Sequence, residues 1–444
     1  MAKILIAGIG GGKKEKKGSY SIADYYIDSE ENLYEDRTFI TSALEEHYKI
    51  DKTVYIGTVG SMWDELYLHY AGEINSEDED YIDELENTII KATKESNISD
   101  INIEKFNEKF NGKVEAIVTK FGINEIEIFE NFNLIMKIGE ILNDGDEVYI
   151  DITHSFRSNA MWMFLIMNYV TDVLDKKIEI KKITYGMFEA GRNIPRENNR
   201  PKKRAPIIDL KVFYDLMKWI KGANEFKNYG NSYTLLEMIN DDEVNKKIKT
   251  FSDGLNLNYL GTIKRNISSL KRIMDTINTI EGPGKLIIPN VVKDFINIFD
   301  NIEKEYEFLF KLAEWNFNQK RYAMTAININ EGLREFVAEI LEIDDRGSDF
   351  NSEKNKIIKY LKKLGRNEKY VKNITKGTYQ KKEDKIYKIF EHTRKIRNEI
   401  AHSKGEKDTA INDVESLKGY IEFINSMIKD KNFIKYLKES CDID

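Results

Sequence analysis

The chain has 444 residues, of which 41 % are hydrophobic, and its formal net charge is −8. This length is too great for one hydrophobic core and predicts about two or three domains, and the negative charge argues against a protein that simply coats nucleic acid. The single cysteine, Cys441, excludes internal disulfides and thiolate metal clusters and fits a reducing compartment.

The N-terminus and the hydrophobic runs bear on localisation. Met1-Ala2-Lys3 leads directly into a strand-like segment, without the pattern of a signal peptide. The longest largely hydrophobic run, residues 160–170, is shorter than the roughly 20 residues that cross a bilayer. We therefore expect a soluble, cytoplasmic protein with no membrane partner.

Strand-like and helix-like segments alternate through the first 190 residues. Short hydrophobic runs typical of buried parallel strands lie at 3–7, 53–57 and 147–151, with one or two more strands over 178–188. Helical patterns lie around 64–70, over 126–142 and over 157–174. This alternation predicts an α/β domain with a mostly parallel sheet covered by helices. The acidic stretch 73–110, with 12 acidic and 4 basic residues, is predicted to be a helical insertion or a solvated excursion.

Prolines and charge indicate the domain boundaries. Three of the five prolines lie between Pro195 and Pro206 among basic residues, and proline disfavours helices and central strands. Helical periodicity dominates after this point, with a second break at Gly282-Pro283-Gly284 and Pro289. The predicted organisation is an α/β domain (1–195), a basic linker (196–206), an all-α connector (207–295) and an all-α terminal domain (296–444).

A glycine-rich loop, Gly8-Ile9-Gly10-Gly11-Gly12-Lys13, follows the first predicted strand. It is not a dinucleotide fingerprint, because Lys13 occupies the position of the last glycine, and it is not a P-loop, because Lys14 replaces the Ser or Thr. What remains is a glycine loop at the carboxyl end of a strand, where the ligands of open α/β sheets collect.

The octapeptide DITHSFRS, which starts at Asp151, closes a predicted strand and opens a helix. Thr153 and Ser155 are able to cap that helix and leave backbone N–H groups directed at an anion. Arg157 offers a charge-assisted contact to phosphate, and His154 offers a hydrogen bond to a phosphate or a base. The alternative is an ordinary N-cap with a histidine whose hydrogen bonds are satisfied internally.

Asp151-Ile152-Thr153-His154-Ser155 resembles the signature of the DxTHG family of CRISPR-associated proteins, with Ser155 in place of the glycine. The segment GTVGSMWDEL, residues 57–66, resembles the family's second loop, and the Gly8 loop with Tyr20 or Tyr25 and the segment 122–125 are looser matches. The resemblance covers roughly residues 1–190. It implies a CARF domain, a Rossmann-like dimeric sensor of cyclic oligoadenylate.

The resemblance also implies which residues bind the activator. A ring with an even number of nucleotides has twofold symmetry, so a twofold dimer is its natural receptor, and each loop would contribute twice. The implied activator-binding residues are Gly8, Ile9, Gly10, Thr58, Ser61, Trp63, Thr153, His154, Ser155, Phe156 and Arg157.

The second notable segment is RNEIAH, from Arg397 to His402. Residues 385–402 are predicted to form one helix, and Arg397 falls within its hydrophobic stripe of Ile386, Ile389, Phe390, Ile396 and Ile400, where an arginine needs a partner or a role. Asn398 and His402 share a face, so the amide is able to orient the imidazole. Arg397 and His402 are roughly 140° apart on the helix. A second copy of the helix across a dimer interface would be needed to bring the two together.

Arg397-Asn398-x-x-x-His402 in an all-helical terminal domain resembles the signature of HEPN ribonucleases, which the DxTHG family commonly joins to its sensor. A helix with Trp315, Tyr322, Ala326 and Glu331 loosely resembles the first helix of that domain. The resemblance implies that Arg397, Asn398 and His402 are catalytic. Without it, the spacing favours a surface histidine near a helix end.

Residues 354–397 contain 16 basic and 4 acidic residues, which fits either a surface that attracts RNA phosphates or a solvated lysine-rich face. The leading hypothesis is a ribonuclease gated by cyclic tetra- or hexaadenylate. It would need no metal, because the RNA 2′-hydroxyl is an internal nucleophile, and it would leave 2′,3′-cyclic phosphate ends. A non-catalytic regulator that binds nucleic acid or a protein partner is the alternative. Slow cleavage of the activator by Thr153 and His154, and assembly beyond a homodimer, stay open.

Overall fold

The computed structural model describes residues 1–11, 22–154, 157–174, 176–194, 202–276, 284–343, 350–366, 378–402 and 410–439. For residues 157–160, 272–276, 350–354, 366 and 378 it describes the backbone alone. The chain divides into two compact units, Met1–Asp215 and Leu216–Asp444.

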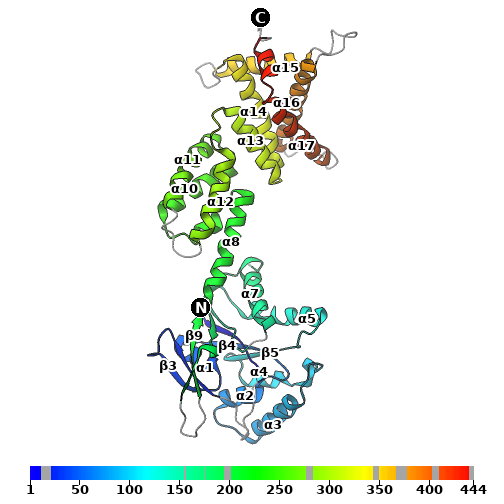
Figure 1. The fold of residues 1–444 in the computed structure, drawn as a ribbon. Coiled ribbons are helices and arrows are strands. Elements are labelled where there is room, and N and C mark those ends of the chain that lie inside the picture. The colour runs from blue at the N-terminus through cyan, green and yellow to red at the C-terminus, as the bar shows by residue number, and fades with distance from the viewer. Residues whose placement is uncertain are drawn as a thin grey trace. The chain divides into compact units, whose positions relative to one another are not determined.

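A nine-stranded sheet forms the centre of the first unit (Figure 1). Its main path has the order β3-β2-β9-β7-β6-β1-β4-β5, and β8 pairs with β9. The strands β7, β6, β1, β4 and β5 are parallel to one another, whereas β9 is antiparallel to β7. The strands are β1 (Lys3–Gly8), β2 (Ala23–Ile27), β3 (Leu33–Arg37), β4 (Lys52–Thr58), β5 (Val114–Thr119), β6 (Glu147–Asp151), β7 (Glu179–Gly186), β8 (Arg192–Ile194) and β9 (Lys202–Asp209).

Helices cover both faces of this sheet (Figure 1). One face packs its alternate strand residues, such as Leu5 and Tyr55, against helices that include α1 and α2, and the other packs residues such as Ile150 against α7. The helices are α1 (Ile40–Tyr48), α2 (Trp63–Ala71), α3 (Ser76–Lys91), α4 (Ile103–Lys109), α5 (Glu125–Ile135), α6 (Ile138–Ile141) and α7 (Arg157–Asp172), with the 3₁₀ turns η1 (Ile98–Asp100) and η2 (Phe188–Ala190). The α/β prediction is confirmed, and the three predicted strands coincide with β1, β4 and β6.

The neighbours of β1 create the topological switch point of the sheet. The chain passes from β1 to β4 on one side and later returns to β6 on the other. In open α/β sheets a crevice forms outside the carboxyl ends of strands where the order reverses in this way. The Gly8 loop and the DITHS loop follow β1 and β6, so both meet at this crevice.

The predicted linker is wrong for residues 202–206, because they begin β9. Pro206 is tolerated there because β9 changes partner at this point: residues 202–204 pair with β8 and residues 207–209 with β7. The basic residues Lys202 and Arg204 both pair with the fully buried Asp24, at 2.7 and 3.2 Å. Residues 195–201 lie outside the described part.

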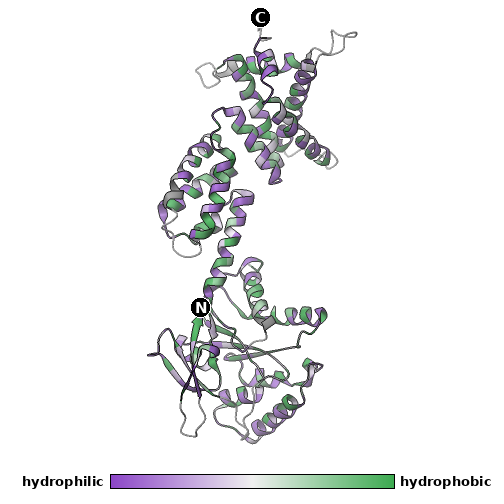
Figure 2. Cartoon of the chain, viewed as in Figure 1, coloured by the Kyte–Doolittle hydropathy of each residue, from purple (hydrophilic) through white to green (hydrophobic). Residues whose placement is uncertain are grey.

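The second unit is helical, and hydrophobic and hydrophilic residues alternate along its helices (Figure 2). The helices are α8 (Lys211–Tyr229), α9 (Tyr233–Leu236), α10 (Asp242–Asn256), α11 (Leu260–Thr276), α12 (Gly284–Phe299), α13 (Glu305–Asn318), α14 (Tyr322–Leu341), α15 (Phe350–Arg366), α16 (Thr378–His402), α17 (Ala410–Met427) and α18 (Lys431–Glu439). One core lies among α8–α12 and part of α13, and a second lies among α13–α18.

Two local predictions in this unit are wrong. Pro289 does not break the chain, since it lies inside α12, where its neighbours Ile288 and Val292 are buried in the core and hold the helix. Trp315 belongs to α13 and Glu331 to α14, so these residues lie on two helices rather than one. In the described part, no helix combines the length and hydrophobicity needed to cross a membrane.

Candidate functional site

A pocket of about 340 Å³ opens at the carboxyl ends of β1, β6 and β7. It is lined mainly by hydrophobic, aromatic and glycine residues, with a few polar groups, as ligand pockets usually are. The lining residues are Gly8, Ile9, Gly10, Gly11, Ile22, Ala23, Tyr25, Thr38, Phe39, Ile40, Thr41, Tyr55, Met62, Thr153, His154, Tyr185, Gly186, Phe188 and Glu189. Five of the eleven predicted activator-binding residues, Gly8, Ile9, Gly10, Thr153 and His154, are among them.

Asp151 organises the DITHS loop from below. Its carboxylate is fully buried and accepts bonds from the Thr153 N–H (3.1 Å), the Thr153 hydroxyl (2.8 Å) and the Thr184 hydroxyl (2.9 Å). Thr153 Oγ1 in turn accepts the Gly186 N–H at 2.8 Å. The Asp151-Thr153 pair therefore joins the ends of β6 and β7 and fixes the position of His154.

The surroundings of these residues shift their pKa values. Burial raises the pKa of the Asp151 carboxyl to about 6, and its hydrogen bonds from Thr153 and Thr184 oppose that rise. Desolvation lowers the pKa of the His154 imidazole, which is therefore neutral at pH 7. Burial, together with the negative charge of Asp151, raises the pKa of Tyr25 to about 12. The pocket thus presents a neutral imidazole and protonated phenols to a ligand.

The second predicted loop does not contribute as expected, because Thr58, Ser61 and Trp63 are buried and absent from the lining. The Ser61 hydroxyl donates to the Ile9 carbonyl (2.8 Å) and accepts the Thr58 N–H (3.0 Å), and the Trp63 indole donates to the Thr58 carbonyl (2.8 Å). The Ser61 hydroxyl, the Trp63 indole N–H and the Thr58 backbone are thus bonded within the protein, and Ser61 supports the Gly8 loop through the Ile9 carbonyl. Met62 alone lines the pocket from this loop.

Three other predicted residues have no described side chain. Ser155 and Phe156 lie outside the described residues, and Arg157 starts α7 with only its backbone described. The contacts expected of these three residues therefore stay predictions.

Sequence reasoning missed the contribution of β7 and η2. Tyr185, Gly186, Phe188 and Glu189 line the pocket opposite the glycine loop. Gly186 has no room for a side chain, because a β-carbon there would lie 2.4 Å from Ile40 Cδ1 and 3.2 Å from Thr153 Cγ2. A glycine at the end of a predicted strand was the available signal, since glycine at such a place often marks a close backbone approach.

The RNEIAH segment lies on α16, as predicted, but Ile400 is 42 % exposed and does not belong to the buried stripe. Arg397 does have a partner: its guanidinium contacts the Glu331 carboxylate of α14 at 2.8 Å. Glu331 also contacts Arg334 at 3.3 Å. Both Arg397 and Glu331 are about one-third exposed, so the pair is accessible to solvent rather than sealed in the core.

An open hollow of about 560 Å³ follows one face of α16. Its described lining comes from this helix alone: Glu391, His392, Arg394, Lys395, Asn398, Glu399 and His402. Asn398 and His402 share this face and are both exposed, without a hydrogen bond between them, while Arg397 is outside the lining. The described chain thus brings Asn398 and His402 together but leaves Arg397 apart.

His392, which sequence reasoning did not single out, fastens α17 to α16. Its Nδ1 lies 2.7 Å from the Tyr420 hydroxyl and its Nε2 lies 3.0 Å from Asp413 Oδ1. Both partners are on α17, which therefore packs against α16 about ten residues before His402. Among the described residues, no group of three or more His, Cys, Asp or Glu side chains has a metal-binding arrangement.

Two family models match the chain. Residues 4–189 match the CARF domain of the CRISPR system endoribonuclease Csx1, and residues 215–305 match the second domain of the CRISPR-associated protein MJ1674. The first unit is therefore a Rossmann-like CARF domain of a CRISPR-associated protein, and a helical region follows it. Over 97 % of its length the chain is 30 % identical to MJ1674 of Methanocaldococcus jannaschii, of which it covers 67 %. The chain belongs to the MJ1674 family of CRISPR-associated proteins.

A solved structure of Csm6 from Enterococcus italicus, bound to cyclic hexa-2′-fluoro-hexa-dAMP, is similar over 99 % of this chain and 98 % of its own. The sequence identity is 12 % and the TM-score is 0.38. The family matches alone confirm the predicted resemblance to CRISPR-associated CARF proteins.

Proposed function

We propose that this protein is a ribonuclease that a cyclic oligoadenylate activates. The observation that carries the proposal is the pocket at the carboxyl ends of β1, β6 and β7, built by the DITHS loop and lined by the Gly8 loop. It lies in a CARF domain whose matched family model carries the name of an endoribonuclease. The same chain holds Arg397, Asn398 and His402 on a helix of its second unit.

The pocket suits a nucleotide ring in both shape and charge. The aromatic side chains of Tyr25, Phe39 and Phe188 line the pocket, and the Phe188 ring, which is 44 % exposed, offers a surface for a base. The first turn of α1 lines the pocket, and its N-cap, Phe39, makes no side-chain capping bond. Helix N-termini favour anions, so phosphates would lie at this end and at the glycine loop. Gly10 lets the glycine loop pack closely against His154, because a β-carbon there would lie 3.2 Å from the His154 carbonyl.

Hydrophobic side chains on α5 and α7 support a homodimer. Ile126 and Phe129 on α5, and Met161 and Leu165 on α7, are each more than half exposed. Exposed hydrophobic patches usually mark contact sites, and α7 starts two residues after the DITHS loop. A second copy packed on this face would bring two pockets to a twofold axis, which matches the symmetry of a ring with an even number of nucleotides.

The proposed cleavage uses the RNA 2′-hydroxyl as its nucleophile. His402, which is exposed, would move protons to or from the reacting oxygens. Arg397 would neutralise the charge that develops on the phosphate, and Asn398 on the face of His402 would orient substrate or imidazole. The P–O5′ bond breaks as the P–O2′ bond forms, leaving a 2′,3′-cyclic phosphate and a 5′-hydroxyl, and no metal is required.

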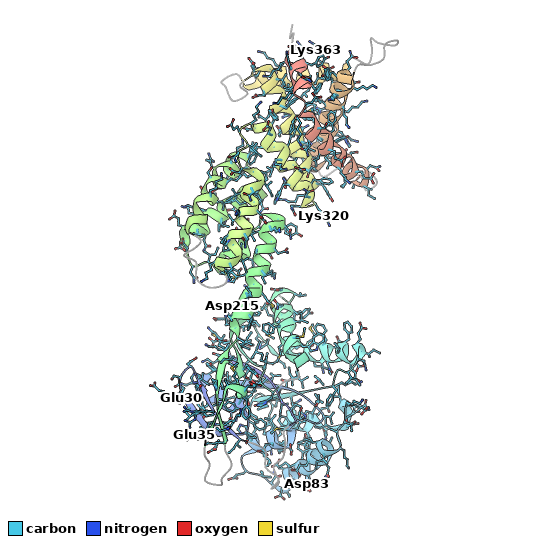
Figure 3. The ribbon with its side chains drawn as sticks, in the orientation of Figure 1. Glu30, Glu35, Asp83, Asp215, Lys320 and Lys363 are labelled. Carbon is cyan, nitrogen blue, oxygen red and sulfur yellow. The ribbon has the colours of Figure 1, made fainter. Side chains whose placement is uncertain are left out.

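Lysines on α15 offer a surface for the RNA backbone. Lys356, Lys359, Lys362 and Lys363 are exposed, while the opposite face of α15 is buried in the core with α16 (Figure 3 labels Lys363). A row of lysines attracts phosphates in a salt-dependent way. Single-stranded RNA is therefore the proposed substrate class.

Slow cleavage of the activator by the protein itself is compatible with this proposal. The two residues suspected of it, Thr153 and His154, differ in how available their side chains are for catalysis. The Thr153 hydroxyl is engaged as donor to Asp151 and as acceptor from Gly186. His154 lines the pocket and its pKa is lowered, so its neutral ring is available as a base. We infer that His154, rather than Thr153, would carry any such activity.

The test is cleavage of a fluorescent single-stranded RNA in EDTA, with cyclic tetra- and hexaadenylate added separately. Cleavage that depends on one of the rings is the expected result. Binding of a ring without cleavage would favour the non-catalytic regulator instead. Absence of binding to either ring would overturn the assignment of the pocket.

A further inference from the structure

Glu189 is unusual for a site that would receive a polyanion. Apart from tyrosines, His154 and Glu189 are the only ionisable side chains in the described lining of the pocket. Hydrogen bonds from its own backbone and from the Tyr185 hydroxyl hold the pKa of the Glu189 carboxyl below its usual value. The carboxylate is therefore charged at neutral pH, and it would repel a phosphate placed against it.

This carboxylate is held in place by one neighbouring side chain, and the turn that carries it is bonded to β9. The Tyr185 hydroxyl lies 3.1 and 3.0 Å from its two oxygens. Backbone and side-chain bonds from β9 fasten the turn η2: the Met187 N–H donates to the Pro206 carbonyl at 2.9 Å, and the Lys203 ammonium donates to the Phe188 carbonyl at 2.9 Å. Lys203 also lies 4.8 Å from the centre of the Phe188 ring, which is 44 % exposed.

We propose that Glu189 is a base-specificity residue, which accepts a hydrogen bond from the exocyclic amine of an adenine stacked near Phe188 and Tyr185. A carboxylate offers only acceptors, so it needs a donor on the ligand. In an adenine nucleotide within a ring the donors are the base amine and the ribose 2′-hydroxyl. The aromatic side chains of Tyr185 and Phe188, which flank Glu189 in the chain and line the pocket with it, offer surfaces for the base, whereas the glycine loop offers backbone N–H groups for the phosphates.

This inference rests on the proposed function and adds base selection to it. Hypoxanthine differs from adenine by a carbonyl in place of the amine, and guanine carries the same carbonyl. In the position of the adenine amine, either base carries a carbonyl, and its nearest donor, N1–H, lies one ring position away. Glu189 is exposed to solvent, so water bonds the carboxylate when the amine is missing, and the expected discrimination is that of one solvent-accessible hydrogen bond. The pocket would therefore favour adenine over guanine or hypoxanthine bound in the same position.

The experiment measures binding of cyclic tetra- and hexaadenylate, of their inosine counterparts and of their 2′-deoxy counterparts by calorimetry, using full-length protein. The wild-type protein is expected to bind the adenine ring about 3- to 10-fold more tightly than the inosine ring. Glu189→Gln presents an amide that is able to donate to the hypoxanthine carbonyl. It should bind the adenine ring more weakly, bind the inosine ring more tightly and lose most of the discrimination.

Two further variants separate recognition from structure. Tyr185→Phe removes the hydroxyl that orients the carboxylate and should weaken binding while keeping the preference for adenine. Glu30→Gln alters a carboxylate on the same unit that pairs with Arg192 at 2.6 Å and is absent from the pocket lining (Figure 3), so it should change nothing.

The outcomes are distinguishable. If wild-type protein binds adenine rings and Glu189→Gln keeps the full preference over inosine, the inference is overturned and the proposed function stands. If Glu189→Gln instead loses only its sensitivity to 2′-deoxy rings, the carboxylate bonds the ribose, and base selection by Glu189 is wrong. If wild-type protein binds no ring at all, the proposed function fails first.

Discussion

The pocket of the first unit and the hollow along α16 are built on different plans. The pocket is lined by segments that follow five strands, and a fully buried carboxylate, Asp151, joins one of these segments to β7 through three hydrogen bonds. The hollow has described walls from one helix only, and Asn398 and His402 lie exposed on it. One site is preorganised within a single chain, whereas the described residues give the other only one wall.

This contrast fits a protein in which one site binds a ligand as it stands and the other needs groups from a further surface. A preorganised pocket loses little free energy on ordering when its ligand binds. A one-sided hollow gains activity only when another surface supplies the missing groups, so its activity is open to control by association or movement. A coupling of about 1–3 kcal/mol between two sites is typical of such control.

Disabling the α16 site alone is the most direct test of whether the two sites have separate roles. His402→Ala removes the proposed acid-base group and should lower RNA cleavage by roughly 10²- to 10⁴-fold. Activator affinity should stay unchanged, because His402 and the pocket belong to separate units. Cleavage rates and calorimetric affinities would be measured side by side. His47→Ala, whose ring bonds Tyr34 in the first unit, serves as the control and should cleave normally.

A complementation experiment tests whether the missing wall is a second copy of α16. Arg397 contacts Glu331 and lies outside the hollow of His402, so a site that uses both residues would join Arg397 of one copy with His402 of the other. Arg397→Ala and His402→Ala proteins should each be inactive alone. Co-expressed, they form mixed dimers that retain one intact pair and should recover measurable cleavage. No recovery in verified mixed dimers would place both residues in a single-chain site or remove one from the mechanism.

Much of the fold of the first unit could be predicted from the sequence, because the signals for its strands and loops are local. The short hydrophobic runs ended by glycine or polar residues located β1, β4 and β6, and a glycine loop after β1 located the pocket edge. Ser61 and Trp63 show where a local motif is ambiguous: a motif preserves structure as readily as ligand contact, both side chains are buried, and their contact with the activator stays a prediction.

Other features depend on long-range contacts that no local pattern reveals. Pro206 lies in a strand because β9 exchanges one neighbour for another beside it. Glu189 joins the pocket because η2 is bonded back to β9. Arg397 was correctly expected to need a partner, yet Glu331 lies 66 positions earlier in the chain, and only the packing of α14 on α16 identifies it.

Asp151→Asn should weaken the preorganisation of the pocket, and its effect on activator affinity should be the next largest after the effects on cleavage. An amide has one acceptor oxygen, so it cannot accept from Thr184 and from both donors of Thr153 as the carboxylate does. Losing bonds to a charged group costs about 1.5–3 kcal/mol, so activator affinity should fall about 10- to 100-fold. Asp146→Asn, at the amino end of β6, alters a buried aspartate that accepts from Ala2 and Asn143, and it should lower stability without lowering affinity.

The same variant has a pH signature. The pKa of Asp151 rises from 3.8 to about 6 on folding, so between these values the folded state holds a proton that the unfolded state has lost. The stability from this group is therefore largest below pH 4 and falls as pH rises to about 6, by about 3 kcal/mol at most. Urea unfolding should show that the unfolding free energy of the wild type minus that of Asp151→Asn declines between pH 4 and about 6. Above pH 7 this difference should stay constant. A constant difference would contradict the raised pKa.

Ser61→Ala should have the smallest effect on activator affinity. It tests whether Ser61 supports the Gly8 loop or contacts the activator. Ser61 is buried, bonds the Ile9 carbonyl and the Thr58 N–H, and does not line the pocket. Its loss should cost about 1–3 kcal/mol of unfolding free energy, because a buried donor and a buried acceptor lose their partner. Activator affinity should change by less than about threefold, or 0.6 kcal/mol. Ser252→Ala, a buried serine of the second unit bonded to Ser232, controls for the stability loss. A tenfold loss of affinity in Ser61→Ala without loss of stability would mean that the hydroxyl reaches the ligand after all.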